Sequence, residues 1–392
     1  MTDMKVTDMN RNHNRNHRKW SGALLAAALL VGTSAGSVQL ASAASASASN
    51  SNSKSALAAP AASKTQASIH LMLNGKPLAQ KALAGLEGTL IPLGALRDSL
   101  GFKVTYDAKT KTYQLVRGNL TVQLAPTTFG TVGVSINGAT QFPNYEWINK
   151  QGLNYVSVHL LTDNLGYRTE WNNATKTVNL LPFQLNSLKV TANTLNQSDK
   201  VTNIQIQYPV ISGLANTEVQ EQINKIFKDR ADAYVQDSLK RSKDLGLGPQ
   251  GAKNEFDMYY TVTYNRNGYL SFRMLNYDYT GGAHGMSYLE GFTFRLSDGK
   301  QVELTDLLKA NPDFVEAIDA KVGAKLNNDP GYFGGFKTVG DKPGFYLKDD
   351  GLVTFFQLYE YLPYAAGFPE YYLPFSSLLP KGADPLTAEA DK

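Results

Sequence analysis

The chain has 392 residues, enough for two or three ordinary domains, and 42% of them are hydrophobic, so it can form cores. It contains no cysteine, which excludes disulfide scaffolds, thiolate metal sites and cysteine nucleophiles. The formal net charge is only +4, which is too small to indicate a nucleic acid as the partner.

The first 43 residues have the order of a secretory signal peptide. A region with five basic residues up to Lys19 is followed by a short apolar run from Gly22 to about Gly32 and by the small residues Ala41-Ser42-Ala43. The apolar run is about half of the ~20 residues that a membrane-spanning helix needs. We expect residues 1–43 to be cleaved on export, with membrane attachment only if this segment is retained.

Two further segments are expected to lack fixed structure. Residues 44–66 are mostly Ala, Ser, Asn and Lys, so they cannot bury enough apolar surface to offset the entropy of ordering. We interpret them as a flexible linker, and residues 381–392 as a disordered polar tail. Export without cysteine is typical of a Gram-positive envelope.

Residues 67–181 contain an internal repeat. Leu90–Leu115 aligns without a gap with Tyr155–Leu180, at an offset of 65 residues. Each copy predicts a short strand, about two helical turns, a glycine in the left-handed cap geometry (Gly101 or Gly166) and two strands joined by a polar turn. We therefore expect a small β-rich domain with short helices.

This repeat resembles the copper-amine-oxidase N-terminal-like domain of exported bacterial proteins. The resemblance rests on the start Leu73-Asn74-Gly75-Lys76, the Leu-Gly end of each helix and the Thr-Lys-Thr turns, although Gly94 and Ser157 replace the usual Arg and Pro. It implies a stalk or wall-interaction module without a copper site. Only His70 and His159 occur here, and no trio of metal ligands exists, so we expect no metal and no cofactor.

Residues 182–380 show a different pattern, with longer alternating strands around two helices. The first helix is expected at the capping-box spacing Thr217-x-x-Gln220, and the second at Asn311-Pro312. Turns such as Asn267-Gly268 between alternating apolar runs indicate hairpins. This order favours a mainly antiparallel sheet with two main helices on one face, so the fold class of the chain is α+β.

The second region resembles a paired domain of unknown function in bacterial envelope proteins. The motifs that carry the resemblance are Val210–Asn216 with Ile223-Asn224, Tyr279–Gly285, Leu304–Leu307 and Pro363–Gly367. The pair forms the extracellular part of lysozyme-responsive anti-sigma factors and the N-terminal extension of a peptidoglycan deacetylase. We expect neither the sigma-factor-binding domain nor the metal-dependent catalytic domain in this chain. The resemblance then implies binding of a wall-directed ligand.

The glycine-rich motif Gly281–Gly285 presents a histidine, His284. As a general base, His284 would need an orienting carboxylate or a nucleophile, for which Asp278 and Ser287 are close in sequence, but no triad signature surrounds them. Alternatively, the glycines permit a tight crossing between strands that His284 locks. We expect no catalytic residue.

Aromatic residues crowd the segments 277–288 and 359–372. Tyrosine suits interfaces because it offers a large area, little rotamer entropy and a polar tip. From these segments we predict a partner-binding face that is made by Tyr277, Tyr279, His284, Tyr364 and Phe368.

These patterns predict a non-catalytic protein of the cell envelope, extracellular or associated with the wall. Its C-terminal domain is expected to bind a lysozyme-like enzyme or peptidoglycan, with the repeat domain as a stalk or wall-interaction module. Two alternatives remain: a structural wall-associated protein without a specific ligand, and a hydrolase that uses His284.

Overall fold

The structure, a computed structural model, describes residues 68–386, and all of them fall in the same structural unit. The predicted signal peptide (1–43), the predicted linker (44–66) and residues 387–392 of the predicted tail lie outside the described residues. The described part of that tail, residues 381–386, packs on the protein through Leu386, which is buried. Within 68–386, no helix has the length and apolar character needed to cross a membrane.

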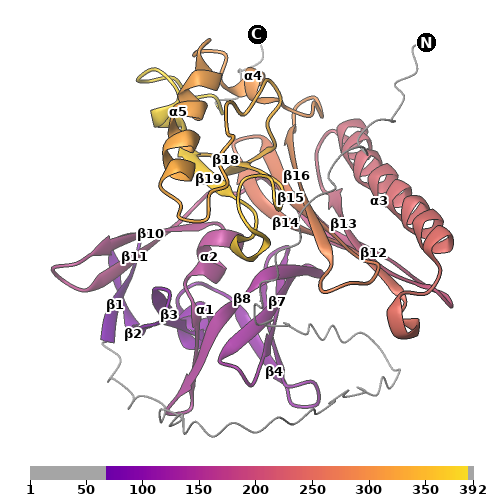
Figure 1. Ribbon diagram of the computed structural model, residues 1–392. Coiled ribbons are helices and arrows are strands. Elements are labelled where there is room, and N and C mark those ends of the chain that lie inside the picture. The colour runs from indigo at the N-terminus through magenta and orange to yellow at the C-terminus, as the bar shows by residue number, and fades with distance from the viewer. Residues whose placement is uncertain (1–67, 387–392) are drawn as a thin grey trace, which may run out of the picture. The chain divides into compact units, whose positions relative to one another are not determined.

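The first region is built from strands of one sheet (Figure 1). The strands run in the order β10-β11-β1-β2-β3-β9-β8-β7-β6-β5-β4. Their bounds are β1 (Ser68–Leu73), β2 (Lys76–Ala84), β3 (Thr89–Pro92), β4 (Lys103–Asp107), β5 (Thr112–Arg117), β6 (Leu120–Pro126), β7 (Thr131–Ile136), β8 (Ala139–Lys150), β9 (Leu153–Ser157), β10 (Tyr167–Asn172) and β11 (Thr177–Pro182). Two short helices, α1 (Leu93–Asp98) and α2 (His159–Asn164), follow β3 and β9.

The two copies of the repeat have the same local structure. Gly101 and Gly166 both have a φ of +73°, which confirms the predicted cap geometry, because glycine reaches this region without a Cβ clash. In the polar turns, Asp107 accepts a hydrogen bond from the backbone two residues on (2.8 Å), and Asn172 does the same (3.0 Å). The two copies therefore share the same glycine at the helix end and the same side-chain hydrogen bond in the polar turn.

The second region begins with a five-stranded sheet in the order β12-β13-β14-β15-β16. Its bounds are β12 (Lys189–Ser198), β13 (Thr202–Ser212), β14 (Asn254–Arg266), β15 (Tyr269–Tyr279) and β16 (Met286–Arg295). Neighbouring strands are antiparallel except β13 and β14, which are parallel. The parallel pair requires a crossover connection, which α3 (Thr217–Leu245) supplies.

The N-terminus of α3 differs from the predicted capping box. The cap is Asn216, whose side chain accepts from the backbone N–H groups of Glu218 (3.1 Å) and Val219 (3.2 Å). Asparagine is a stronger N-cap than threonine, so Thr217 becomes the first helical residue. The helix then buries Phe227 in the sheet, where its ring contacts three phenylalanine rings.

The chain ends in a second, three-stranded sheet and two more helices. Their bounds are α4 (Leu304–Leu307), α5 (Phe314–Asn327), β17 (Phe345–Lys348), β18 (Gly351–Phe355) and β19 (Glu370–Pro374). Tyr346 and Val353 pack toward Leu289 of the five-stranded sheet, whereas Leu347 and Leu352 pack in the core that contains α5.

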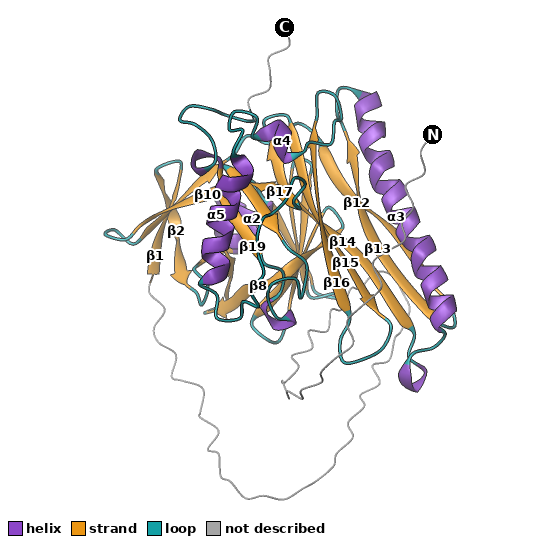
Figure 2. Ribbon diagram, turned by 45° about the horizontal axis from the view of Figure 1, so that its top comes forward, coloured by secondary structure: helices purple, strands orange, loops and turns teal. Residues whose placement is uncertain are grey.

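This alternation explains how the two main helices are placed. α3 covers the five-stranded sheet, and α5 covers the three-stranded sheet (Figure 2). The α+β class is confirmed. The two helices lie on different sheets. β17 and β18 carry apolar residues at both odd and even positions, so both faces of the three-stranded sheet are buried.

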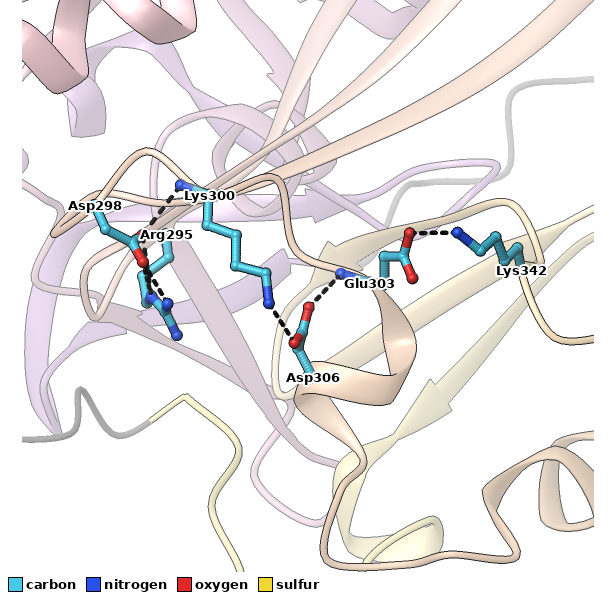
Figure 3. Close-up of polar contacts among 6 residues, drawn as sticks. All are labelled: Arg295, Asp298, Lys300, Glu303, Asp306 and Lys342. Atoms are coloured by element: carbon cyan, nitrogen blue, oxygen red, sulfur yellow. Dashed lines mark hydrogen bonds and ion pairs between the residues drawn. The ribbon is translucent and has the colours of Figure 1, made fainter. Parts of the chain in front are cut away.

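The motif Leu304–Leu307 is the one-turn helix α4, which is capped and flanked by ion pairs (Figure 3). Asp306 accepts from the backbone N–H of Glu303 (3.0 Å) in a reciprocal capping box. Lys300 pairs with Asp306 (2.6 Å), and Lys342 pairs with Glu303 (2.9 Å).

We expect Asp306→Ala to lower the free energy of unfolding by about 1 kcal/mol, because it removes half of the capping box and a surface ion pair. Asp306→Asn keeps a side-chain acceptor and should recover most of that loss. Urea denaturation of both variants measures the difference. An unchanged midpoint for Asp306→Ala would show that the cap contributes nothing.

Candidate functional site

The glycine motif forms the loop between β15 and β16, and its glycines are sterically required. Gly281 and Gly282 have φ values of +103° and +98°. A Cβ on Gly281 would lie 2.7 Å from the side chain of Pro249, and one on Gly285 would lie 2.3 Å from the ring of Tyr277. The loop therefore folds closely onto Tyr277.

His284 joins this loop to the segment that follows β18. Its ring stacks on that of Tyr364, with centroids 4.0 Å apart and planes 24° apart. Nδ1 lies 2.8 Å from the carbonyl oxygen of Gly285, so Nδ1 carries the proton, and Nε2 accepts from the hydroxyl of Tyr359 (3.2 Å). Both ring nitrogens are engaged.

The two tyrosines complete a cluster of rings in which His284 and Tyr359 are exposed and Tyr364 is half-buried. Tyr359 has a φ of +65°, which is rare for a residue with a Cβ, and is 46% exposed. Its ring centroid is 5.6 Å from that of Tyr364, whose hydroxyl donates to the carbonyl of Gly285 (3.1 Å). We call the surface made by Tyr277, Tyr279, His284, Tyr359 and Tyr364 the aromatic face.

Two carboxyl groups border the aromatic face. Asp257 and Glu255 of β14 pair across the strands with Tyr277 and Tyr279, so these side chains point to the same side of the sheet. Glu255 is exposed, whereas Asp257 is largely buried, and its Oδ1 has no hydrogen-bond partner among the described residues. Burial, followed by the neighbouring carboxylates of Glu255 and Asp278, raises the pKa of Asp257 to about 7.

Four of the five residues predicted as a partner-binding face lie on the aromatic face. Phe368 is the exception, because it packs in a small core with Leu289. The guanidinium carbon of Arg273 lies 5.8 Å from the centroid of the Phe368 ring. Phe368 is half-buried, and its place in a partner-binding face stays a prediction.

The sequence analysis singled out the aromatic segment that contains Tyr359 but did not include Tyr359 in the predicted face, and it did not single out Glu255 and Asp257, which border the face. The two acids had a signal, since they alternate in β14 with the buried residues Asn254 and Phe256. Their side chains must therefore lie on the side of the sheet opposite to Asn254 and Phe256. Tyr359 had a signal too, since it lies in the aromatic segment 359–372, but its contact with His284 joins residues 75 positions apart and could not be predicted.

The two residues considered as partners for His284 lie elsewhere. Asp278 pairs across the strands with Phe256 and so points toward α3, where it accepts from the hydroxyl of Tyr234 and from Nη1 of Arg241 (2.6 Å). It therefore does not orient His284. Ser287 lies opposite Tyr277 in the sheet, and no hydrogen bond joins it to His284 in the described part of the chain.

No group of three or more acidic or histidine side chains within residues 68–386 is arranged to hold a metal ion. His159 is exposed at the start of α2, with Nε2 3.2 Å from the carbonyl oxygen of Glu87.

Three segments of the chain match protein families. Residues 72–180 match the copper amine oxidase N-terminal domain, residues 195–287 match deacetylase PdaC, and residues 305–376 match a protein of unknown function (DUF3298). The chain thus combines a copper amine oxidase N-terminal domain, a PdaC-like region and a DUF3298 domain. Both predicted resemblances are confirmed.

One curated relative is the peptidoglycan-N-acetylmuramic acid deacetylase PdaC of Bacillus subtilis (strain 168). It is 24% identical over 183 residues, which are 45% of this chain and 37% of that protein. The chain spans little more than a third of the length of this relative. Two solved DUF3298 structures are also similar: one from Bacteroides fragilis (19% identity, 52% of this chain, 98% of that chain, TM-score 0.41) and one from Pseudomonas aeruginosa (14%, 50%, 98%, 0.32).

The aromatic face lies where the two C-terminal matches meet. Tyr277, Tyr279 and His284 belong to the PdaC-like region, and Tyr359 and Tyr364 belong to the DUF3298 domain. The hydrogen bond between His284 and Tyr359 joins the two regions directly.

Proposed function

We propose that this chain is a cell-envelope protein whose C-terminal region binds peptidoglycan through the aromatic face. The observation that supports this most is the ring cluster of His284, Tyr359 and Tyr364, in which His284 and Tyr359 are exposed. Stacked rings with polar edges suit a partner that combines apolar C–H faces with hydroxyl groups, as sugars do. The similarity to a protein named as a peptidoglycan deacetylase supports the same ligand.

The border of carboxyl groups supports a second candidate, a basic lysozyme-like protein. Glu255 is exposed beside the tyrosines, and a negative rim attracts a positively charged partner and speeds its association. Salt separates the two candidates, because binding of a basic protein would weaken as salt screens Glu255, whereas stacking on a glycan depends little on salt.

The roles that we propose for the other segments rest on the sequence patterns. Residues 1–43 direct export and are cleaved, residues 44–66 tether the folded part, and residues 67–181 serve as a stalk or wall-interaction module beside the binding region 182–380. The protein acts outside the cell or on the wall, by binding and without a reaction. A wall-dissolving or deacetylating activity that disappears in His284→Ala would contradict the non-catalytic proposal.

We expect Tyr359→Ala to weaken binding of the full chain to purified peptidoglycan by about 5–30-fold, because truncating a central aromatic residue costs about 1–2 kcal/mol of binding energy. Sedimentation of the protein with insoluble peptidoglycan at increasing amounts measures this change. A parallel titration with lysozyme at low and high salt tests the second candidate.

Tyr288→Ala is the matched control for this prediction. Tyr288 is also a tyrosine that is 46% exposed, but it pairs with Asn276 and points to the side of the sheet that α3 covers. Its substitution should leave binding unchanged. Equal binding by wild type and Tyr359→Ala, with both peptidoglycan and lysozyme, would refute the aromatic face as a binding site.

A further inference from the structure

The exposed carboxylate beside the aromatic face has no positively charged partner. Glu255 lies opposite Tyr279 and diagonal to Tyr277 across the two strands. In the part of the chain that the structure describes, no hydrogen bond or ion pair engages its side chain. Lys253 is two residues away in the sequence, but its Nζ donates to Oγ of Ser198 (3.0 Å). Glu255 is therefore free to pair with a cation on a bound molecule.

Asp257 adds to the negative charge at this place. It follows Glu255 by two residues in β14, so both carboxyl groups lie on the same side of the sheet. Burial raises the pKa of Asp257, and the carboxylate of Glu255 raises it further, because the two groups repel each other. Oδ1 of Asp257 is buried, so we assign the direct contact to Glu255 alone. A cation beside Glu255 relieves the repulsion between the two carboxylates.

The rings of the aromatic face favour the same kind of ligand. The face of a tyrosine ring carries partial negative charge and attracts an ammonium group within about 6 Å. Burial raises the pKa of Tyr277, and the charges of Glu255 and Tyr364 raise it further, so its hydroxyl lies near both the carboxylate and the ring cluster. Nε2 of His284 accepts from Tyr359 (3.2 Å), so this ring is neutral and does not repel a cation. Tyr277 therefore connects Glu255 with the ring cluster.

Two forms of a glycan can be compared at this surface. An N-acetylated sugar carries a neutral amide, which leaves the charge of Glu255 unpaired. A de-N-acetylated sugar carries an ammonium group, which pairs with Glu255 and is attracted by the rings. We propose that the aromatic face prefers glycan strands with free amino groups, with Glu255 as their ion-pair partner. This inference rests on the proposed function and names the form of the ligand that the site binds.

Such a ligand must come from the hydrolysis of an amide. Water attacks the carbonyl carbon of the N-acetyl group, the bond between that carbon and the nitrogen breaks, and acetate leaves. The nitrogen stays on the sugar and takes up protons to become the ammonium group. By this inference, the chain acts after an N-deacetylation and recognises its product.

The test is a calorimetric titration of the full chain with a glucosamine tetramer and with the matching N-acetylglucosamine tetramer, at a pH at which the amines are protonated. The two probes differ only in the acetyl groups. At low salt, where the exposed Glu255 is screened least, the glucosamine tetramer should bind about 2–10-fold more tightly.

Two variants with the same substitution assign the preference to Glu255. Glu255→Gln removes the charge but keeps the size of the side chain, and it should lose most of the preference. Glu221→Gln is the matched control, because Glu221 is also exposed but lies on α3, which covers the other side of the sheet. This control should prefer the glucosamine tetramer as strongly as the wild type does.

The outcomes separate this inference from the proposed function. Equal affinities of the wild type for the two tetramers, with both weakened in Tyr359→Ala, overturn the inference and leave the proposed function standing. A preference that persists in Glu255→Gln, or a glucosamine tetramer that does not bind, overturns the inference as well. If Tyr359→Ala binds both tetramers and peptidoglycan as the wild type does, the proposed function itself fails.

Discussion

Replacing Asp278 by alanine is expected to lower the free energy of unfolding by about 3 kcal/mol. The Asp278 side chain is 9% exposed and holds two groups of α3, the hydroxyl of Tyr234 and the guanidinium of Arg241 (2.6 Å). Removing one partner of a buried ion pair leaves the other charge uncompensated, which costs about 3–5 kcal/mol. Arg241 is 36% exposed and keeps a second ion pair with Asp237 (2.8 Å), so water and Asp237 compensate part of this cost, and the lower end of the range applies.

Asp298→Ala is the matched control, measured by urea denaturation under the same conditions. Asp298 also pairs with an arginine, Arg295, but the two side chains are 44% and 36% exposed, so the loss should not exceed about 1 kcal/mol. Asp278→Asn keeps an acceptor for Tyr234 and should fall between these two variants. Equal losses for the two alanine variants would mean that Asp278 does not anchor α3 to the end of β15.

Replacing Asp257 by asparagine is expected to stabilise the protein above neutral pH. Burial and the nearby carboxylates raise the pKa of Asp257 from 3.8 to about 7 in the folded protein. Between these two values the folded state binds the proton and the unfolded state does not. The stability of the wild type therefore falls as the pH rises through this window, by at most ~1.4 kcal/mol per pH unit and about 2–4 kcal/mol in total.

Asp257→Asn lacks this titration. Its free energy of unfolding should match that of the wild type near pH 4 and exceed it by about 2–4 kcal/mol at pH 8, and urea denaturation across this range measures the difference. Glu255→Gln removes a neighbouring carboxylate that contributes to the raised pKa of Asp257. Because burial is the larger cause, this variant should lower the pH window only in part and keep most of the pH dependence. A constant difference between Asp257→Asn and wild type at all pH values would contradict the raised pKa.

The strands, turns and helices could be predicted from the sequence where their causes are local. The cap glycines Gly101 and Gly166 and the turn residues Asp107 and Asn172 act on a backbone only a few residues away. Their effect is the same wherever the segment lies, so a repeated sequence produces a repeated structure. The capping of α3 was predicted one residue too late, because two capping residues, Asn216 and Thr217, compete at adjacent positions.

The candidate site was predictable only in part. Alternation along β15 puts Tyr277 and Tyr279 on one side of the sheet and Asp278 on the other, so Asp278, which is close to His284 in the sequence, faces α3 instead. Phe368 is half-buried against Leu289, and its role in a partner-binding face stays a prediction.

The sequence by itself determined the local elements, the repeat and the side of each strand to which a residue points. Interactions within a few residues fix these features. Only the tertiary structure decided that Tyr359 meets His284. This contact depends on how whole sheets pack against one another. The total apolar area buried selects that packing, and no single stretch of the chain encodes it.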